Sequence, residues 1–359
     1  MVKPPFWIFS NRSHRFKSFY RLRIAAIGGN MTRRGRPTLR TIANEADLAV
    51  ATVSRALSDD PQIAPETRAR VRQIAASQGY SPDRAAQRLR TGRTNVIAFL
   101  LNPHEEILGY GQSMIRGLTE ALRDTSFHLV IMPVFSDRPT IEPVESILRN
   151  RLADGVIFSR TTPDDMRVRL LLEHGFPFVC HGRTELATPH PWVDYDNFGF
   201  AYAAATRLIA QGIRRPCLIP APDGMTFAQH LRMGFLRACG DAGIAGEVLS
   251  GISLDDTPAA IQAHIRGLIS NNSLPDGFVC PGEISAMAVH AACSDAGHST
   301  RIVMKHTSGM ADIIRPHFDS IFEDLAEAGM LMGRFLQRAI AGEPPQTLQF
   351  LQPAAPIAA

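Results

Sequence analysis

The stretch from Pro37 to Thr94 begins PTLRTIANEADLAVATVSRAL and ends SPDRAAQRLRTGRT. Its apolar spacing predicts a short helix capped by Thr38 and a second helix that starts near Val50. The inward-facing residues would be Leu39, Ile42, Ala43 and Ala46 in the first helix, and Val53, Ala56 and Leu57 in the second. Only three residues separate these helices, so they must cross steeply. The pattern therefore predicts a helix-turn-helix unit that presents its second helix to the major groove of DNA.

A third helix is predicted to begin at Pro65, to bury Val71 and Ile74 and to end at Gly79, where Tyr80 would cover the small core. The segment DRAAQRLRTG after Ser81-Pro82 has room for barely two helical turns. A helix of that length is marginal in water, so we expect this segment to be helical only when something stabilises it.

These motifs, LxxIAxxAxxxxATVSRAL and SPxRAAQRLRTGRT, resemble the head of the lactose-repressor (LacI) family of bacterial transcription regulators, and the similarity extends from about Leu39 to the C-terminus. Two positions depart from the family pattern. Asp47 stands where the family usually has Gly, and Ala49 stands where it usually has Ser. Asp tolerates a left-handed backbone, so the turn can form, whereas Ala49 cannot cap the second helix or donate to a phosphate.

The second helix would expose Val50, Ala51, Thr52, Ser54 and Arg55. Arg is the commonest reader of guanine and small apolar groups can meet thymine methyls, so we predict base readout by Arg55, Val50 and Ala51, with Thr52 and Ser54 near phosphates. Thr38 and Leu39 complete the DNA-binding set of this unit. The alternatives are plain helix propensity at Val50 and Ala51, and contact with the DNA backbone alone at Arg55.

In the family the short segment after Ser81 is a hinge helix, which folds when two copies pack together on the operator and each wedges a Leu into the minor groove. The resemblance assigns this lever to Leu89, the helix contact to Ala86, and phosphate contacts to Arg84 and Arg88. Such wedges unstack bases and kink the duplex. The alternative is an exposed linker that happens to contain a Leu.

The charge of the chain is unevenly distributed. Of its 359 residues, positions 1–95 carry 18 basic side chains against 6 acidic ones, whereas positions 96–359 carry 20 against 28. A head of +12 joined to a body of −8 indicates that the head binds a polyanion and that the body does not. The alternative, a basic face that is merely solvated, does not explain a helix-turn-helix inside the basic part.

The length predicts two or three domains. The five cysteines are odd in number and scattered without a C-x-x-C motif, which favours small buried side chains in a reducing cytoplasm. We find no apolar run long enough for a bilayer, and residues 1–30 lack the features of a signal peptide. Residues 1–36 are expected to form a basic, disordered extension, unless Met31 is the natural start.

From Asn95 onward, short apolar runs alternate with longer amphipathic ones, which predicts parallel sheets with helices on both faces. The first half is predicted to hold strands at 96–101, 129–135, 155–159 and 176–180, with helices at 115–123, 141–150 and 164–174. The second half would hold helices ending at 210 and spanning 228–242, 259–270 and 284–296, with strands at 217–219, 247–249, 278–280 and 302–304.

Two such halves resemble periplasmic sugar-binding proteins, the relatives of the LacI body. The predicted organisation is therefore an all-α helix-turn-helix head (37–81), a hinge (82–94) and an α/β body of two doubly wound parallel-sheet subdomains (95–359). The resemblance places crossovers near Asp196, Ile321 and Leu348. It assigns about 95–195 and 322–347, which include a helix at 325–341, to the first subdomain, and about 196–321 and 348–353 to the second.

A ligand of such a body would lie in the cleft between the halves, at the carboxyl ends of strands. The candidate polar residues for binding this effector are Asn102, Arg160, His181, Arg183, Asp196, Arg232, Glu283, Lys305, His306 and Glu323. Tyr110, Phe227 or Trp192 would supply an apolar surface for a sugar ring. For each of them the alternative is an ordinary surface or internally satisfied side chain.

Three departures from the family pattern affect this cleft. Gly282-Glu283 replaces the usual Asn-Asp, Lys305-His306-Thr307-Ser308 replaces Gly-Phe-Asp-Asp, and Leu231 replaces an Arg, with Arg232 beside it. The motifs PHEEI, FSRT, HGRTEL, HPxVDYDN and IFEDLAEAG, together with the lysine at a strand end, are similar to those of a subgroup of alpha-glucoside-utilisation repressors. The effector should therefore not be inferred from the best-known members.

The sequence gives little support to two other classes of function. An enzyme would be expected to show a G-x-G-x-x-G, P-loop, G-x-S-x-G or H-E-x-x-H motif, and none is present; His190 with Asp194 and Asp196 is better interpreted as a proline-bounded turn than as a metal site. A transport component would need an export signal. We therefore expect a cytoplasmic homodimer at a near-palindromic DNA operator, regulated by a small molecule such as a sugar, with no cofactor, metal or membrane partner.

Overall fold

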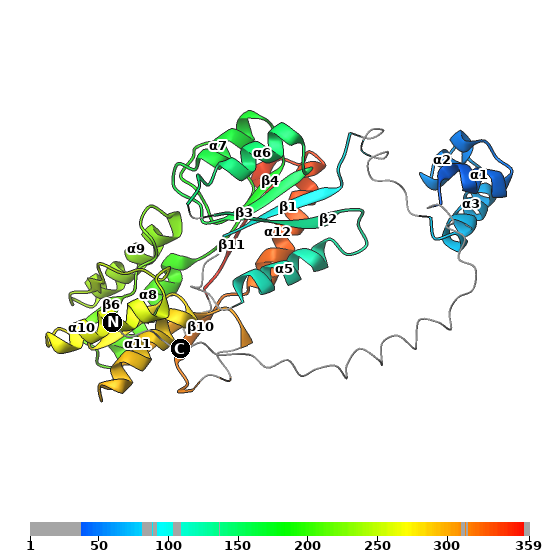
Figure 1. Ribbon diagram of the computed structural model, residues 1–359. Helices are drawn as coiled ribbons and strands as arrows, with labels where there is room; N and C mark the ends of the chain where they lie inside the picture. The colour runs from blue at the N-terminus through cyan, green and yellow to red at the C-terminus, as the bar shows by residue number, and fades with distance from the viewer. Residues whose placement is uncertain are drawn as a thin grey trace, which may run out of the picture. The chain divides into compact units, whose positions relative to one another are not determined.

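The chain divides into two units between residues 90 and 91, inside the predicted hinge, and residues 37–80 of the first unit form three helices. The computed structural model describes residues 37–80, 88, 92–102, 109–135, 137–309, 313 and 315–354 (Figure 1). The predicted extension over residues 1–36 and the hinge residues Arg84, Ala86 and Leu89 lie outside these ranges. Arg88 is described and exposed.

The helices of the first unit are α1 (Leu39–Ala46), α2 (Val50–Leu57) and α3 (Pro65–Ser77). Thr38 caps α1 as predicted: its hydroxyl accepts from the Thr41 amide at 3.3 Å, and the Thr41 hydroxyl accepts from the Thr38 amide at 3.0 Å. The core consists of residues from all three helices, among them Ile42, Ala46, Val53, Ala56, Val71 and Ala75, with Tyr80 packed against it.

The turn between α1 and α2 confirms both effects expected from the departures in sequence. Asp47 ends α1 with φ 51° and ψ 49°, the left-handed conformation that Asp tolerates. Ala49 occupies the N-cap position of α2 and provides no side-chain hydrogen bond. The two helices pack against each other across this turn, but α2 begins without a side-chain cap.

The second unit contains two sheets in which every described strand pair is parallel. The first sheet has the order β11-β5-β4-β3-β1-β2 and the second the order β10-β9-β8-β6-β7. The strands of the first sheet are β1 (Val96–Leu101), β2 (His128–Pro133), β3 (Gly155–Ser159), β4 (Phe178–His181), β5 (Trp192–Tyr195) and β11 (Gln349–Gln352). Those of the second are β6 (Pro216–Leu218), β7 (Glu247–Val248), β8 (Gly277–Cys280), β9 (Arg301–His306) and β10 (Asp319–Phe322).

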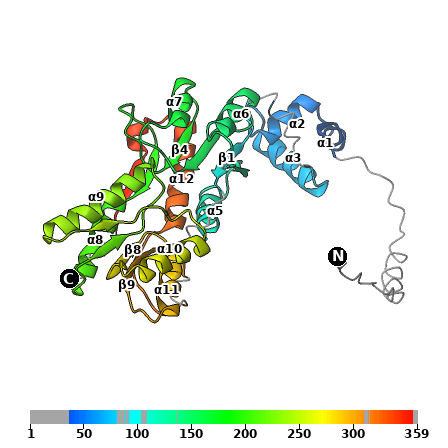
Figure 2. The ribbon, with the colours of Figure 1, turned by 60° about the vertical axis from the view of Figure 1, so that its left-hand side comes forward.

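Helices cover both faces of the first sheet. Side chains alternate across a strand, so Ile97 and Phe99 pack with α5 (Tyr110–Ala121) and α12 (Leu325–Ile340), whereas Ala98 and Leu100 pack with α6 (Glu142–Asn150) and α7 (Met166–Glu173). The helices α5 and α12 lie side by side (Figure 2). Their approach requires glycine, because a Cβ added at Gly117 would lie 1.9 Å from the carbonyl oxygen of Ala326.

The second sheet shares one continuous core with its helices. These are α8 (Asn197–Ala210), α9 (Thr226–Asp241), α10 (Pro258–Ser270) and α11 (Glu283–Asp295), of which α8 packs with α9 and α10 with α11. Each predicted helix of the body is present with its ends displaced by a few residues. Among the described residues, no helix has both the length and the apolar composition needed to cross a membrane.

Three short strands were not predicted, and one of them corrects the predicted subdomain boundary. We expected residues 348–353 in the second subdomain, but β11 pairs with β5 in the first sheet. The Trp192 amide donates to the Leu348 carbonyl at 3.0 Å, and the Asp196 amide donates to that of Gln352 at 2.9 Å. Leu348 is fully buried in the first core, and its burial explains why the chain end returns there.

Candidate DNA-binding surface and ligand cavity

The outward face of α2 matches the face predicted to read DNA. Val53 and Ala56 are fully buried, whereas Val50 is 43% exposed and Ala51 and Arg55 are also exposed. Thr52 and Ser54 are half-buried beside them. The helix therefore presents two small apolar side chains, two hydroxyls and a guanidinium on one side.

Arg55 is held by two neighbours that the sequence reasoning missed. Its Nε donates to Asp60 Oδ2 at 2.8 Å, and its Nη2 donates to Gln62 Oε1. The hydrogen bond from Arg55 is the main reason that the pKa of Asp60 lies below its ordinary value. A guanidinium has five N–H donors, so Arg55 keeps donors for DNA while Asp60 and Gln62 restrict its direction.

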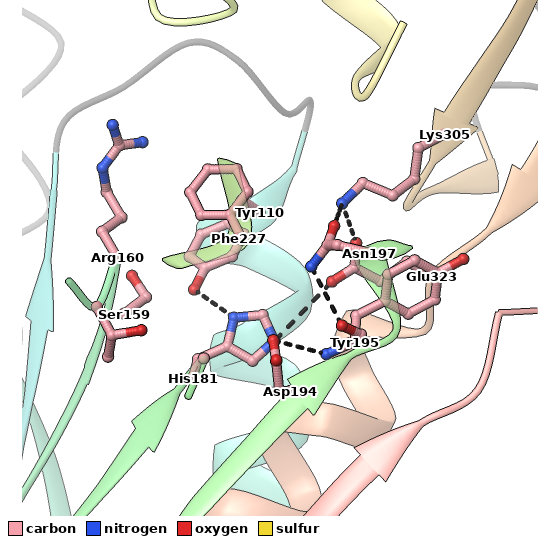
Figure 3. A pocket seen from close by; sticks show the side chains of 12 residues that line it. Tyr110, Ser159, Arg160, His181, Asp194, Tyr195, Asn197, Phe227, Lys305 and Glu323 are labelled. Carbon is pink, nitrogen blue, oxygen red and sulfur yellow. Dashed lines mark hydrogen bonds and ion pairs between the residues drawn. The ribbon is translucent and has the colours of Figure 1, made fainter. Parts of the chain in front are cut away.

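A cavity of about 500 Å³, including the solvent at its mouth, lies between the two subdomains of the body (Figure 3). The carboxyl ends of β3, β4, β5 and β9 and the first residues of α5, α8 and α9 approach it. Its lining consists of Tyr110, Ser159, Arg160, Thr161, His181, Gly182, Asp194, Tyr195, Asn197, Phe227, Lys305 and Glu323. This is the site predicted for parallel sheets, at strand ends between two domains.

A chain of polar contacts crosses the cavity wall. Tyr110 Oη lies 3.2 Å from His181 Nδ1, and His181 Nε2 lies 3.9 Å from Glu323 Oε1. Lys305 Nζ then contacts Glu323 Oε2 at 2.7 Å and donates to Asn197 Oδ1 at 3.1 Å. These side chains come from both subdomains and from the crossover after β10, so the network depends on how the halves are arranged.

Burial determines the protonation of several of these groups. It lowers the pKa of His181, an effect that nearby Lys305 reinforces and Glu323 opposes, so the imidazole is neutral at pH 7. Burial also raises the pKa of Asp194, although the Arg183 guanidinium opposes the rise from 2.7 Å. The pKa of the Tyr195 phenol is raised far above its ordinary value, mainly by burial.

The charges around the cavity are balanced. Among the described residues that line or flank it, the ion pairs are Arg160 with Asp255, Arg183 with Asp194, and Lys305 with Glu323. Within the described part of the chain, Ser159 Oγ and His181 Nε2 are buried without a hydrogen-bond partner. Since buried polar groups are nearly always satisfied, a hydroxyl-bearing ligand that reached these atoms through the cavity would supply the missing partners.

Of the predicted effector residues, Tyr110, Arg160, His181, Phe227, Lys305 and Glu323 line the cavity. The others lie elsewhere, mostly with internal partners. Arg183 holds Asp194 and lies 5.5 Å from the Trp192 ring, which does not line the cavity either. Asp196 caps α8 by accepting from the Gly199 amide at 2.9 Å.

Four further candidates also lie outside the cavity lining. Glu283 is fully buried and accepts from the Thr307 amide at 2.7 Å. The ring of His306 packs 5.0 Å from that of Phe322. Asn102 is half-buried just after β1, and Arg232 lines a separate, smaller hollow beside α9.

Sequence reasoning missed Ser159, Thr161, Gly182, Asp194, Tyr195 and Asn197 in the lining. The segment around Asp194 was interpreted as a turn, but Trp192–Tyr195 is a strand whose end faces the cavity. The FSRT and VDYDN motifs were the available signals. His190, weighed as a metal ligand, uses both ring nitrogens internally, with Thr188 O at 3.1 Å and Thr184 Oγ1 at 3.3 Å.

The fold and the two sites define a DNA-binding regulator with a two-lobed small-molecule domain. Residues 38–83 match the bacterial regulatory proteins of the lacI family, and residues 94–329 match the periplasmic binding proteins and sugar binding domain of the LacI family. The chain belongs to the LacI family of bacterial transcriptional regulators.

Two curated relatives share most of the chain. The HTH-type transcriptional regulator AglR of Rhizobium meliloti is 32% identical over 276 residues, which cover 72% of this chain and 73% of the relative. The HTH-type transcriptional regulator CelR of Thermobifida fusca is 28% identical over 325 residues, which cover 87% and 94%.

Two solved structures resemble the fold. A transcriptional regulator CelR–cellobiose complex superimposes with a TM-score of 0.63 at 25% identity, covering 89% of this chain and 98% of that one. The lac repressor dimer bound to operator and the anti-inducer ONPF has a TM-score of 0.75 at 17% identity, covering 89% and 97%. The second likeness is one of fold alone.

Proposed function

We propose that this regulator is a repressor that binds a near-palindromic operator as a homodimer and that a neutral sugar in the cavity controls this binding. The observation that carries the proposal is the charge balance of the cavity, because the lining holds two cations and two carboxylates, each already paired with an opposite charge. A ligand with a net charge would therefore bring a charge without a partner into a partly desolvated site.

The shape and lining support a sugar rather than another neutral molecule. The cavity opens between the two lobes of the body at the carboxyl ends of parallel strands, a position that small-molecule sites commonly occupy. Tyr110 and Phe227 offer rings to the apolar faces of a sugar, while Ser159 Oγ and the His181 imidazole offer hydrogen bonds to hydroxyls. The CelR–cellobiose complex among the neighbours supports the same class of ligand.

The Lys305–Glu323 pair gives the site both a donor and an acceptor. The ammonium can donate to one hydroxyl oxygen and the carboxylate can accept from the next, so together they would bind adjacent hydroxyls of one ring. Lys305 stands where typical family members carry the Gly of Gly-Phe-Asp-Asp, so this charge pair is a departure from the family pattern. We therefore expect a selectivity among neutral sugars that differs from that of the best-known members.

The regulatory mechanism follows from the two-lobed body. In a dimer paired through its body domains, two heads contact the two half-sites of an operator. The ligand changes operator affinity only if it binds one arrangement of the lobes more tightly than the other. We further propose that the chain acts in the cytoplasm, where its DNA lies, and has no catalytic activity of its own.

The experiment that tests the sugar is a thermal-shift screen of the full chain. Cellobiose, maltose and sucrose would be compared with the charged controls glucose 6-phosphate and gluconate. A ligand that prefers the folded body must raise its melting temperature, so we expect a shift with at least one neutral saccharide. A shift with the charged compounds alone would overturn the charge-balance argument.

A gel shift at two salt concentrations tests the DNA-binding proposal. The DNA would be genomic fragments that have first been enriched by binding to this protein. Specific binding should fall steeply with salt because phosphate contacts release counterions. A sugar found in the thermal screen should change the amount of complex. Absence of any sequence-specific complex would reject the repressor function, and an unchanged complex would reject control by that sugar.

A further inference from the structure

Loops from the first subdomain reach the second across the cavity mouth. Arg160, just after β3, donates through both terminal nitrogens to Asp255, which lies between β7 and α10; Nη1 is 3.1 Å from Oδ1. The Thr226 amide donates to the Thr161 carbonyl at 2.9 Å. At this point of the described chain an ion pair and a backbone hydrogen bond join the halves next to each other, and Arg183 Nη2 also lies 3.4 Å from His230 Nδ1 of the second subdomain.

Hydrogen bonds within the first subdomain hold the backbone of Arg160 in place. Its φ is 59°, a conformation that non-glycine residues seldom adopt. The buried Arg167 side chain donates to the carbonyls of Arg160 at 3.0 Å and of Ser159 at 3.2 Å. Asp165 in turn holds Arg167, with Oδ2 2.6 Å from Nη2. The backbone of Arg160 is therefore held in place within the first subdomain, so its ion pair with Asp255 restrains the position of the second subdomain.

We propose that Asp255 is a positioning residue that holds the two subdomains closed through Arg160 and so determines how tightly the cavity retains its ligand. Arg160 lines the cavity, whereas Asp255 does not. The effect of Asp255 on ligand affinity would therefore be indirect. The effect on affinity rests on the proposed function, since it requires the cavity to bind a sugar.

Partial burial strengthens the Arg160–Asp255 ion pair, and this strength determines how firmly the pair holds the two subdomains closed. The Arg160 side chain is 11% exposed and that of Asp255 is 32% exposed. A bidentate, partly desolvated pair is stronger than an ordinary surface pair, yet salt still screens it. The apparent dissociation constant of a ligand that binds only the closed form equals the intrinsic constant divided by the closed fraction. Loss of the pair therefore weakens binding by lowering that fraction.

The arrangement of the lobes can be measured without any ligand. The five native cysteines are buried, so spin labels can be directed to Glu173→Cys and Asn271→Cys, exposed positions on the first and second subdomains. Labelled full-length protein, diluted with unlabelled protein to suppress distances between protomers, would be studied by pulsed electron paramagnetic resonance. The variants are Asp255→Asn, the conservative Asp255→Glu, and the control Asp241→Asn.

Asp241 is a matched control because it pairs with Arg237 on the same subdomain at 3.0 Å, away from the cavity. We expect Asp255→Asn to lengthen and broaden the distance between the labels, and Asp255→Glu and Asp241→Asn to leave it near that of the parent. Raising salt from about 0.05 M to about 0.5 M should move the parent toward Asp255→Asn. Identical distributions for the parent and Asp255→Asn would overturn the proposal.

Calorimetric titration with cellobiose and maltose then tests the effect on affinity. Asp255→Asn should weaken the binding of a neutral saccharide roughly threefold to tenfold, and Asp255→Glu should restore most of it. Affinity should fall with salt in the parent but hardly in Asp255→Asn, a difference that simple loss of folded protein would not produce. If neither sugar binds the parent, the sugar proposal fails while the label distances still decide whether Asp255 closes the lobes.

Discussion

Lys305 and Glu323 lie side by side at the cavity wall, with 2.7 Å between Nζ and Oε2, and their side chains are 5% and 3% exposed. They belong to β9 and to the crossover that follows β10, so this pair links the second sheet to the returning chain. Lys305 also lies 5.1 Å from the Tyr195 ring and donates to Asn197. Its charge is therefore compensated on several sides.

Removing one partner of this pair should cost more stability than removing both. Lys305→Met leaves the Glu323 carboxylate buried and uncompensated, which we expect to lower the free energy of unfolding by about 3 kcal/mol. The double variant Lys305→Met, Glu323→Leu should recover most of that loss. Urea unfolding of the single and double variants measures the difference, and purely additive losses would contradict strong coupling.

The second prediction concerns Asp60, which holds Arg55 on the recognition helix. Asp60→Asn removes the carboxylate that holds the guanidinium, so Arg55 should become available to a phosphate. Non-specific DNA affinity should rise, and the slope of its logarithm against that of salt should steepen by about 1. Asp59→Asn is the control, because Asp59 pairs with Arg68 and Arg72 instead. Equal effects of both variants would show that the gain in affinity comes from removing a negative charge in general and not from releasing Arg55.

The third prediction concerns pH and His181. Its pKa is lowered below the ordinary 6.5, mainly by burial. As pH falls below 6.5, the unfolded state takes up a proton before the folded state does, so the free energy of unfolding decreases until the folded pKa is passed. Above pH 7 both states are neutral and the effect vanishes. His190 and His230 are shifted in the same direction, also mainly by burial.

His181→Gln should therefore reduce, but not abolish, the loss of stability between pH 7 and pH 5. The measurement is urea unfolding of both proteins at several pH values, and the comparison uses the slope rather than the absolute stability. An unchanged slope would mean that His181 is protonated equally easily in both states.

A fourth prediction tests the contact between α5 and α12. Gly117→Ala would place a Cβ 1.9 Å from the Ala326 carbonyl oxygen and 2.7 Å from the Met330 amide. The helices must separate, so we expect a loss of about 3 kcal/mol in stability. Gly267→Ala is the control: it lies in α10 with no atom within 4 Å of the added Cβ, and it should stabilise the body by about 0.5–1 kcal/mol. Thermal unfolding compares the two.

The sequence predicted the head and the alternating body because their helices and central strands have strong local patterns. Phe99, for example, lies in a run of six residues with a buried centre. The strands β5, β10 and β11 escaped prediction because their sequences, WVDY, DSIF and QFLQ, mix polar and apolar residues and form no apolar run. In addition, β11 pairs with β5, which lies far away in the chain. Asp194 and Tyr195 in the cavity were missed for the same reason.

Local patterns also could not distinguish a polar side chain that lines the cavity from one that supports it. Arg160 and Arg183 both follow buried strands, but only Arg160 lines the cavity. Arg183 holds Asp194 from behind. Similarly, the direction of Arg55 depends on Asp60 and Gln62, which lie beyond the end of its helix. These assignments depend on tertiary contacts.

The last prediction concerns the uncapped start of the recognition helix. Ala49 lies on the surface, and its backbone has φ −65° and ψ 145°. This extended conformation is the one that a capping residue needs. Ala49→Ser would allow its hydroxyl to accept from a free amide in the first turn of α2 and should stabilise the helix by about 1 kcal/mol. Amide hydrogen exchange in the full chain should then slow in α2, while the body remains unchanged. The control is Ala51→Ser, at an exposed position two residues later, because a Ser inside the helix cannot act as its N-cap. Equal protection of α2 in both variants would show that capping is not the cause.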